Sequence, residues 1–377
     1  MSLHRHREGH KSMVHVRPGI DSIKLYVPGR ATTGLSEIGE LPYVPLASNE
    51  SPFAPLPSVV KAIEEVVGKL NRYPDPGVYA LREALAAELD VPLAQVAVGA
   101  GSMTLCLQAV LSTCGAGDEL MFASPSYEGY PLLASVAGAT AVKIPLRDGA
   151  HDLDAMAEAV TDRTRAIFIC NPNNPTGSTV EAQRIERFVE EVRDDILILI
   201  DEAYAEFMGD PIKTVGLSLV RRHANVVSLR TFSKAHGLAG LRVGYLVGQP
   251  AVVEVVQRSH MPFNTNTLAQ AAAIASLKDR DGLAARLAEV RTERAFVLDG
   301  LRQLGLPVRD TFTNFAWLDL GDQAEAFAAE MGRHGVLVRP LPPHGVRITL
   351  GDRVANERAL ATVATVLATF ERDLSPA

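Results

Sequence analysis

The chain has 377 residues, of which 47% are hydrophobic and 21% are charged, and its formal net charge is -7. A single hydrophobic core stops growing at about 250–300 residues, so this length predicts two domains. The Lys and Arg residues form no long basic run, which argues against nucleic acid as the main partner. No apolar run is long enough to cross a membrane, so we expect no membrane association.

The cysteine pattern argues against a disulfide framework or a zinc site. Cys106, Cys114 and Cys170 form no CxxC pair and are odd in number, which fits the reducing cytoplasm, and we expect no bound metal. The N-terminal segment 1–13 is polar and basic, with no apolar stretch behind it. We therefore expect a tail here rather than a secretory signal.

From about Leu46 onward, short apolar runs alternate with stretches of helical periodicity. The predicted strands are Val96–Val98, Leu120–Ala123, Ala166–Cys170, Ile196–Ile200 and Val226–Leu229. The predicted helices are Ser58–Leu70, Tyr79–Leu89, Met103–Thr113, Asp152–Val160 and Val180–Val192. This alternation predicts an α/β fold, in which helices flank a mostly parallel central sheet.

After about Met261 the pattern changes to that of a smaller α+β domain. A long helical region is expected from Ala269 to about Leu304. Further strands are expected at Phe315–Leu320 and Arg347–Leu350, and further helices at Gln323–Gly332 and Asn356–Glu371. We therefore predict a large domain over residues 46–265 and a small domain built from residues 1–45 and 266–377.

Polar clusters directly follow five of the predicted strands. They are Gly99–Met103, Ser124–Tyr127, Asn171–Gly177, Asp201–Tyr204 and Arg230–Lys234. Ligands of open α/β sheets bind beyond the carboxyl ends of the strands, so we expect these clusters to meet at one edge of the sheet.

The clusters contain the groups that pyridoxal phosphate (PLP) requires of a protein. This cofactor needs an amine for its aldehyde, an acid for its pyridine nitrogen and a cradle for its phosphate. Lys234 supplies an amine, and Asp201, at the end of an apolar run, is a carboxylate that needs a cation. Ser233 and Arg242 suit a phosphate, as do the free N–H groups of a helix that opens at Ser102.

These residues resemble those of the fold-type-I aminotransferases. The similarity is greatest to the subgroup of histidinol-phosphate aminotransferases and their aromatic amino-acid (phenylalanine) aminotransferase relatives. Its most specific motifs are Asn171–Gly177, Asp201–Tyr204 and Arg230–Arg242, and it extends from about Val16 to about Leu367. The resemblance implies a PLP-dependent enzyme that transfers amino groups in two half-reactions.

The resemblance also implies roles for the residues that face the cofactor ring. Lys234 resembles the lysine that binds the cofactor as a Schiff base and later shuttles the proton. Asp201 resembles the partner of the pyridine nitrogen, and Asn174 and Tyr204 resemble the pair that binds the ring oxygen. Tyr127 resembles the aromatic residue that stacks on the ring.

Other matching residues are expected to bind the cofactor phosphate and the substrate. Those expected at the phosphate are Gly101, Ser102, Thr231, Ser233 and Arg242, and Met103 is also expected to bind the cofactor. Tyr73 resembles a tyrosine that reaches the phosphate from a neighbouring subunit, which implies a homodimer with shared sites. Arg347 resembles the arginine that binds the substrate carboxylate, and Arg339 stands where a second substrate-binding arginine is expected. Tyr26 and Asn49 resemble residues that line the substrate pocket.

The expected substrates are small molecules, namely an amino acid and a 2-oxo acid. Leu46–Glu50, Pro55–Pro57, Tyr26–Gly29 and Gln270–Ser276 resemble the aromatic type, so phenylalanine or tyrosine with 2-oxoglutarate is favoured. A histidinol-phosphate aminotransferase of histidine biosynthesis is the alternative, because Arg339 and Arg347 would both suit a phosphate. A PLP-dependent decarboxylase and a non-catalytic PLP-binding protein remain further possibilities.

Overall fold

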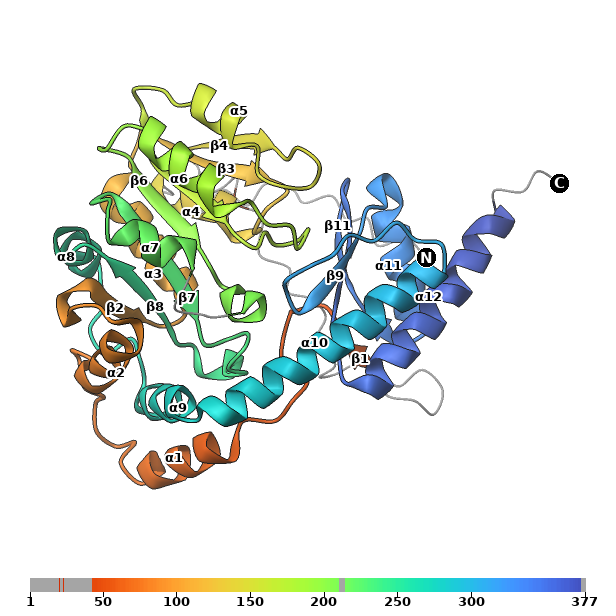
Figure 1. The fold of residues 1–377 in the computed structure, drawn as a ribbon, viewed down its shortest axis with the longest axis horizontal. Helices are drawn as coiled ribbons and strands as arrows, with labels where there is room; N and C mark the ends of the chain where they lie inside the picture. The colour runs from red at the N-terminus through yellow and green to blue at the C-terminus, as the bar shows by residue number, and fades with distance from the viewer. Residues whose placement is uncertain (1–19, 21–22, 24–42, 210–213, 374–377) are drawn as a thin grey trace, which may run out of the picture.

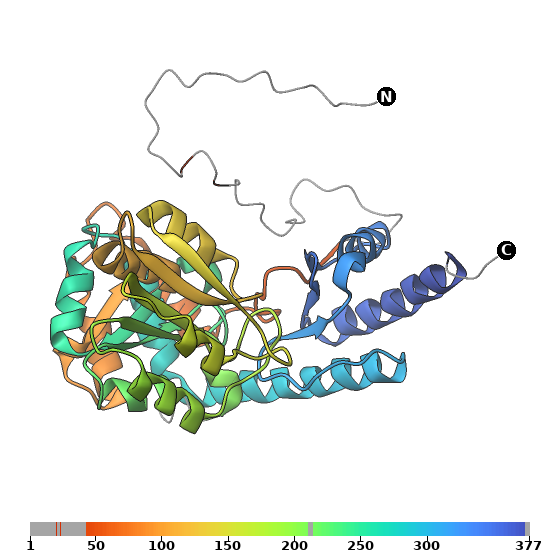
Figure 2. The same ribbon diagram turned by 90° about the horizontal axis from the view of Figure 1, so that it is seen from above.

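The computed structural model describes residues 20, 23, 43–209 and 214–373. It forms two lobes that are bridged by the long helix α10 (Arg280–Gln303), as Figures 1 and 2 show. The large lobe is built on a seven-stranded sheet and the small lobe on a three-stranded sheet. None of the described helices is both long and apolar enough to cross a membrane.

The sheet of the large lobe is parallel except for one strand. Its strands are β2 (Val96–Gly99), β3 (Glu119–Ser124), β4 (Thr140–Pro145), β5 (Thr164–Cys170), β6 (Leu197–Asp201), β7 (Val226–Thr231) and β8 (Gly244–Gly248). They lie in the order β2-β8-β7-β6-β5-β3-β4, and β8 pairs antiparallel with both of its neighbours. The predicted α/β class is therefore confirmed, and β4 and β8 are strands that the sequence did not predict.

Helices cover both faces of this sheet. One face carries α3 (Ser102–Thr113), α4 (Gly129–Ala137) and α8 (Pro250–Arg258). The other carries α1 (Pro57–Val67), α2 (Tyr79–Leu89), α5 (Leu153–Glu158), α6 (Ala182–Glu191), α7 (Val215–Val220) and α9 (Thr267–Lys278). Because both faces are covered, the central strands β6 and β7 are buried along their whole length.

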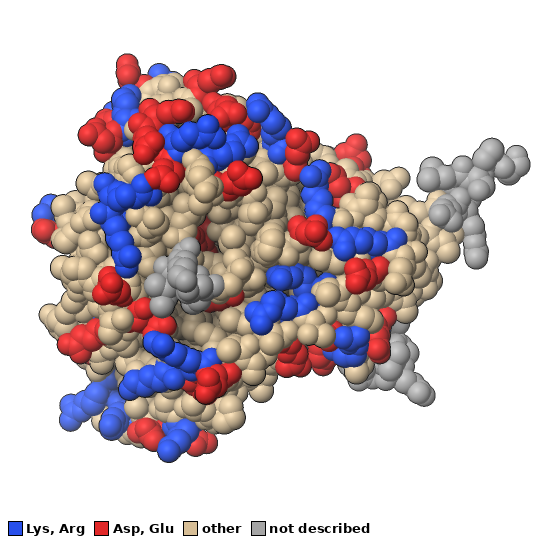
Figure 3. All heavy atoms as spheres, viewed as in Figure 1, with Lys and Arg blue, Asp and Glu red and all other residues tan. Residues whose placement is uncertain are grey.

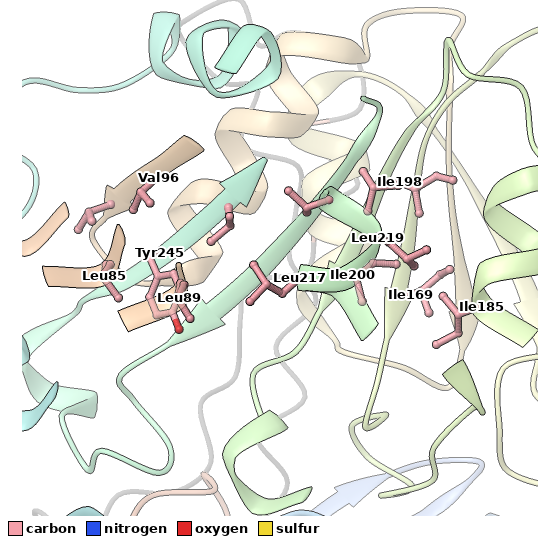
Figure 4. Close-up of a cluster of buried hydrophobic side chains, with 14 of the residues drawn as sticks. Leu85, Leu89, Val96, Ile169, Ile185, Ile198, Ile200, Leu217, Leu219 and Tyr245 are labelled. Atoms are coloured by element: carbon pink, nitrogen blue, oxygen red, sulfur yellow. The ribbon is translucent and has the colours of Figure 1, made fainter. Parts of the chain in front are cut away.

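The packing of α6 shows how the periodicity of a helix places it on the sheet. Its buried residues Ile185, Phe188 and Val189 recur at helical spacing, so they form one apolar stripe. Figure 4 shows Ile185 close to Ile169 of β5, which is paired with Ile200 of β6. Contacts of this kind hold the helices on the sheet and so fix the positions of the strands whose carboxyl ends carry the polar clusters.

The expected long helix after Ala269 is divided in two. Asp279 ends α9 and caps α10, since its Oδ1 accepts a hydrogen bond of 3.0 Å from the amide of Gly282. The buried alanines of α9 belong to the large hydrophobic cluster, and α9 packs on α1 and α2. We therefore propose to place the boundary between the lobes at Asp279 rather than at residue 265.

The small lobe is an α+β unit. Its antiparallel sheet contains β9 (Phe315–Leu318), β11 (Arg339–Leu341) and β12 (Gly345–Thr349), in the order β11-β12-β9. The helices α10, α11 (Ala324–Arg333) and α12 (Arg353–Asp373) enclose its core. The short strand β1 (Val44–Pro45) pairs in parallel with β10 (Val336–Leu337), so the chain enters the described fold along the small lobe.

Four short 3-10 helices complete the described structure: Leu93–Gln95, Ala205–Met208, Ala239–Leu241 and Gly321–Gln323. On the face shown in Figure 3, basic and acidic side chains are intermingled and form no large patch of one sign.

Candidate active site

A cavity of about 370 Å³ lies between the two lobes, beyond the carboxyl ends of β5, β6 and β7. Most of the predicted site residues line it: Asn49, Ser102, Met103, Tyr127, Asn174, Asp201, Tyr204, Thr231, Ser233, Lys234, Arg242, Arg339 and Arg347. Gly101 lies directly behind this wall, against Arg242. Tyr73 is not among the lining residues, and Tyr26 lies outside the described residues.

Lys234 follows β7 and extends toward the N-terminal side of the cavity. Its Nζ donates hydrogen bonds to the carbonyl oxygens of Ser48, at 3.2 Å, and Asn49, at 3.0 Å. Burial lowers the pKa of this amine to about 7, and the positive charge of Arg347 adds to the effect. A substantial fraction of the amine is therefore neutral near pH 7, as a nucleophile or a base must be.

Asp201 is the last residue of β6 and its side chain is buried. The hydroxyl of Tyr130 donates a hydrogen bond of 2.7 Å to Oδ2, and the amide of Ala203 donates one of 3.2 Å to Oδ1. Burial raises the pKa of the carboxyl, whereas these two hydrogen bonds oppose that rise. A buried carboxylate that faces a cavity is suited to bind a cationic ligand group.

Two further polar pairs line the cavity near Lys234. The Nη1 of Arg347 donates a hydrogen bond of 2.6 Å to Oδ1 of Asn174, and Nδ2 of Asn49 donates one of 2.8 Å to the hydroxyl of Tyr204. Burial raises the pKa of Tyr204, so its hydroxyl keeps its proton. These hydrogen bonds hold groups from both lobes in place beside the amine.

The wall beside α3 has the chemistry of an anion site. Gly101 has a φ of 82°, and a Cβ there would lie 2.5 Å from Nη2 of Arg242. Ser102 begins a 12-residue helix, whose first N–H groups have no partner within the helix. Arg242 donates a hydrogen bond of 3.4 Å to the hydroxyl of Ser233, and Thr231 accepts one of 3.1 Å from the Ser233 amide.

Tyr127 lines the cavity between the large lobe and the small lobe. It meets Tyr130 edge to face, at 5.4 Å between ring centroids, and Tyr130 stacks on Phe168 at 4.2 Å. A hydrogen bond of 2.7 Å from Ser126 to Asn173 connects the turn that contains Tyr127 to the polar loop after β5. Tyr130 was missed from the sequence, since it lies within the apolar helix α4 and nothing nearby indicates a polar partner.

Two predicted residues have unexpected surroundings. Arg339 forms a salt bridge with Glu128, which sequence reasoning also missed, at 2.7 Å between Nη2 and Oε1. Tyr73 is 81% exposed and stacks on Phe263 at 4.6 Å between ring centroids. Within this chain, therefore, Tyr73 does not contribute to the cavity wall.

Comparison with known proteins matches this chain to aminotransferases. A family model described as aminotransferase class I and II matches residues 42–363. The aromatic amino acid aminotransferase of Mycobacteroides abscessus is 48% identical over 345 residues, which cover 92% of this chain and 97% of that protein. The aromatic amino acid aminotransferase of Rhodococcus opacus is 49% identical over 346 residues, which cover 92% and 94%.

Among solved structures, the histidinol-phosphate aminotransferase of Sinorhizobium meliloti in complex with pyridoxal-5'-phosphate superposes with a TM-score of 0.86. It is 28% identical, and the match covers 96% of this chain and 100% of that one. The similarity in sequence and in fold therefore extends over both lobes.

Proposed function

Since this chain belongs to the class I and II aminotransferase family, we propose that it transfers amino groups between aromatic amino acids and a 2-oxo acid such as 2-oxoglutarate. PLP is the cofactor in this proposal. The observation that carries it is that one cavity is lined by both Lys234, whose pKa is about 7, and the buried carboxylate of Asp201. An aminotransferase needs both groups, whereas a binding protein needs no poised amine.

The cavity residues fit PLP. Asp201 would hold the protonated pyridine nitrogen, and Asn174 and Tyr204 would bind the ring oxygen, with Tyr127 against the ring. The phosphate would lie in the cradle formed by Gly101, Ser102, Thr231, Ser233 and Arg242, and Met103 would also contact the cofactor. Support for this cradle comes from Gly101, because a side chain there would enter the space that Arg242 borders.

The residues of the cavity suggest what each side chain contributes to the reaction. Bound PLP supplies an electrophilic aldehyde and a ring that delocalises the electrons left when the substrate loses its α-proton. Lys234 would take up that proton on its neutral Nζ, and the resulting ammonium would donate it again in the same half-reaction. Arg347 binds the substrate carboxylate and orients the α-carbon toward Lys234.

The aromatic substrate class is supported by the two relatives named above, whose names carry that activity and which match more than nine-tenths of this chain. Phenylalanine and tyrosine are the proposed donors. The second candidate is histidinol phosphate, which is favoured by the similarity to the Sinorhizobium meliloti structure. Arg339 and Arg347 both line the cavity and would both suit its phosphate.

We also propose a homodimer in the cytoplasm. Tyr73 and Phe263 form an exposed aromatic pair outside the cavity, which suits a protein contact better than open solvent. In a dimer, Tyr73 would reach the cofactor phosphate in the neighbouring subunit. The free cysteines Cys106, Cys114 and Cys170 suit a reducing compartment.

The test is to measure transamination from glutamate to phenylpyruvate, 4-hydroxyphenylpyruvate and imidazole-acetol phosphate with the PLP-loaded enzyme. We expect a kcat/KM at least about tenfold higher for the aromatic acids, which corresponds to about 1.4 kcal/mol of transition-state stabilisation. A preference for imidazole-acetol phosphate would replace the aromatic proposal with the second candidate. Absence of activity on all three would overturn both substrate classes.

A further inference from the structure

A salt bridge connects the two lobes across the cavity wall. Arg339, the first residue of β11 in the small lobe, donates two hydrogen bonds to Glu128, which precedes α4 in the large lobe. Nη2 lies 2.7 Å from Oε1, and Nε lies 3.1 Å from Oε2. The Arg339 side chain is 13% exposed and the Glu128 side chain 38%. Such a two-point contact is the strongest arrangement between a guanidinium and a carboxylate.

Arg339 and Arg347, which both line the cavity, therefore have different kinds of partner. Arg347 donates hydrogen bonds to the neutral oxygens of Asn174 and Ala47. The charge of Arg339 is instead offset by the carboxylate of Glu128. A ligand that binds at Arg347 therefore meets an ion pair, and not a second cation, at Arg339, whereas Arg242 lies at the proposed phosphate cradle.

We propose that Glu128 is a specificity-determining residue, because it keeps Arg339 from binding the anionic group of the substrate. This inference rests on the proposed function. The site then accepts substrates whose anionic group is a carboxylate, which one guanidinium can bind through two oxygens. It discriminates against substrates that carry a phosphate monoester in the same position.

The charge and shape of the two anions explain the discrimination. A phosphate monoester carries between one and a half and two negative charges at pH 7 and has three strong acceptor oxygens, so it is best bound by two cationic forks. To use Arg339, a phosphate would have to displace Glu128 or lie beside it. The first loses a two-point ion pair and the second places like charges together in a partly dry cavity. A carboxylate at Arg347 requires neither.

The experiment compares the holoenzyme with Glu128→Gln, which preserves the size of the side chain and removes its charge. We expect the ratio of kcat/KM for imidazole-acetol phosphate to that for phenylpyruvate to rise at least tenfold, through a lower KM for the phosphate substrate. We also expect calorimetry to show at least fivefold tighter binding of phenyl phosphate, with binding of 3-phenylpropionate changed less than twofold. An unchanged substrate ratio would overturn the proposal.

Two further variants separate charge from architecture. In the double variant Glu128→Gln/Arg339→Gln, the gain for phosphate ligands should disappear, since it depends on the released guanidinium. Asp310→Asn removes an exposed salt bridge with Arg302 outside the cavity and should leave the ratio unchanged. If Glu128→Gln changed both substrates by the same factor, the salt bridge would be a latch between lobes and not a determinant of specificity. A wild-type preference for imidazole-acetol phosphate would instead refute the proposed function itself.

Discussion

The Nζ of Lys234 lies 3.0 Å from the carbonyl oxygen of Asn49, and Nδ2 of Asn314 lies 3.1 Å from the same oxygen. Asn49 is also bound to the small lobe, because its amide donates a hydrogen bond of 3.0 Å to the hydroxyl of Thr349. The amine that follows β7 of the large lobe is thus positioned by backbone held by the small lobe. Its place in the cavity depends on how the lobes meet.

A substitution at Asn314 tests this coupling. Asn314→Ala removes the donor to the Asn49 carbonyl, so the carbonyl and with it Lys234 lose a fixed position. We expect kcat to fall by about tenfold and its pH profile to shift, which corresponds to about 1.4 kcal/mol in the transition state. Asn225→Ala is the matched control, since Asn225 also donates to a backbone carbonyl, that of Ile196. If both variants lost activity alike with unshifted profiles, Asn314 would have a structural role only.

The lowered pKa of Lys234 predicts how stability depends on pH without the cofactor. Between pH 7 and the ordinary lysine pKa of 10.5, the unfolded chain holds a proton that the folded chain releases. The free energy of unfolding therefore increases as pH rises through that window. Below pH 7, the folded protein bears the full cost of keeping this buried amine protonated. Lys234→Met removes the penalty, so the cofactor-free variant should exceed the wild type by about 1–3 kcal/mol at pH 6.5, a range reduced for partial exposure.

Denaturant unfolding at pH 6.5 and pH 10 measures this difference. The advantage of Lys234→Met should shrink as pH increases. An advantage of equal size at both values would mean that the amine is not strained by burial and has an ordinary pKa.

Most residues of this site could be predicted from the sequence, because they stand at or just after the ends of strands that are themselves predictable. The ends of β5, β6 and β7 carry Asn174, Asp201 and Lys234, and apolar runs identify all three strands. By contrast, β4 is an edge strand with several exposed residues and shows no continuous apolar run. β8 begins and ends with glycine, which is depleted in strands, so only three of its residues are left to indicate a strand.

Contacts between lobes could not be predicted in the same way. Glu128 and Arg339 are 211 residues apart, and their salt bridge depends on how the lobes are oriented, which no local pattern encodes. Asn314 follows a loop of the small lobe, and its hydrogen bond to Asn49 spans 265 residues. The hydrogen bond of Tyr130 to Asp201 could not be predicted for another reason, because a tyrosine in an apolar helix is usually a packing residue.

Tyr130→Phe tests the buried carboxylate. The ring should still pack on Phe168, but Asp201 loses the hydroxyl that opposes the rise of its pKa. The carboxylate then holds the cofactor cation less well, and we expect PLP affinity to fall about fivefold, for one lost hydrogen bond worth about 1 kcal/mol. Titration of the cofactor-free protein with PLP measures this. Tyr79→Phe, at an exposed position, should bind PLP as the wild type does.

Hybrid dimers test whether the sites are shared. Lys234→Ala should abolish turnover and the visible absorbance of lysine-bound cofactor, and Tyr73→Ala should weaken cofactor retention at least tenfold. If Tyr73 serves the neighbouring subunit, a mixed dimer of the two variants has one doubly damaged site and one intact site. Refolding the variants together should therefore restore about a quarter of wild-type activity, since half of the dimers are mixed and each has one good site. No recovery would show that Tyr73 does not act across an interface.

Gly101→Ala tests the proposed phosphate cradle. In Gly101→Ala the new Cβ would lie 2.5 Å from Nη2 of Arg242, and the positive φ of 82° would be strained as well. Gly117→Ala is the matched control, because Gly117 has a φ of 93° and a Cβ added there would have no atom within 4 Å. Both variants should lose about 1 kcal/mol of stability from backbone strain. Only Gly101→Ala displaces the guanidinium, so only this variant should bind PLP more than tenfold more weakly, as measured by equilibrium titration. Equal loss of PLP affinity in both would mean that strain, not the position of Arg242, governs the cradle.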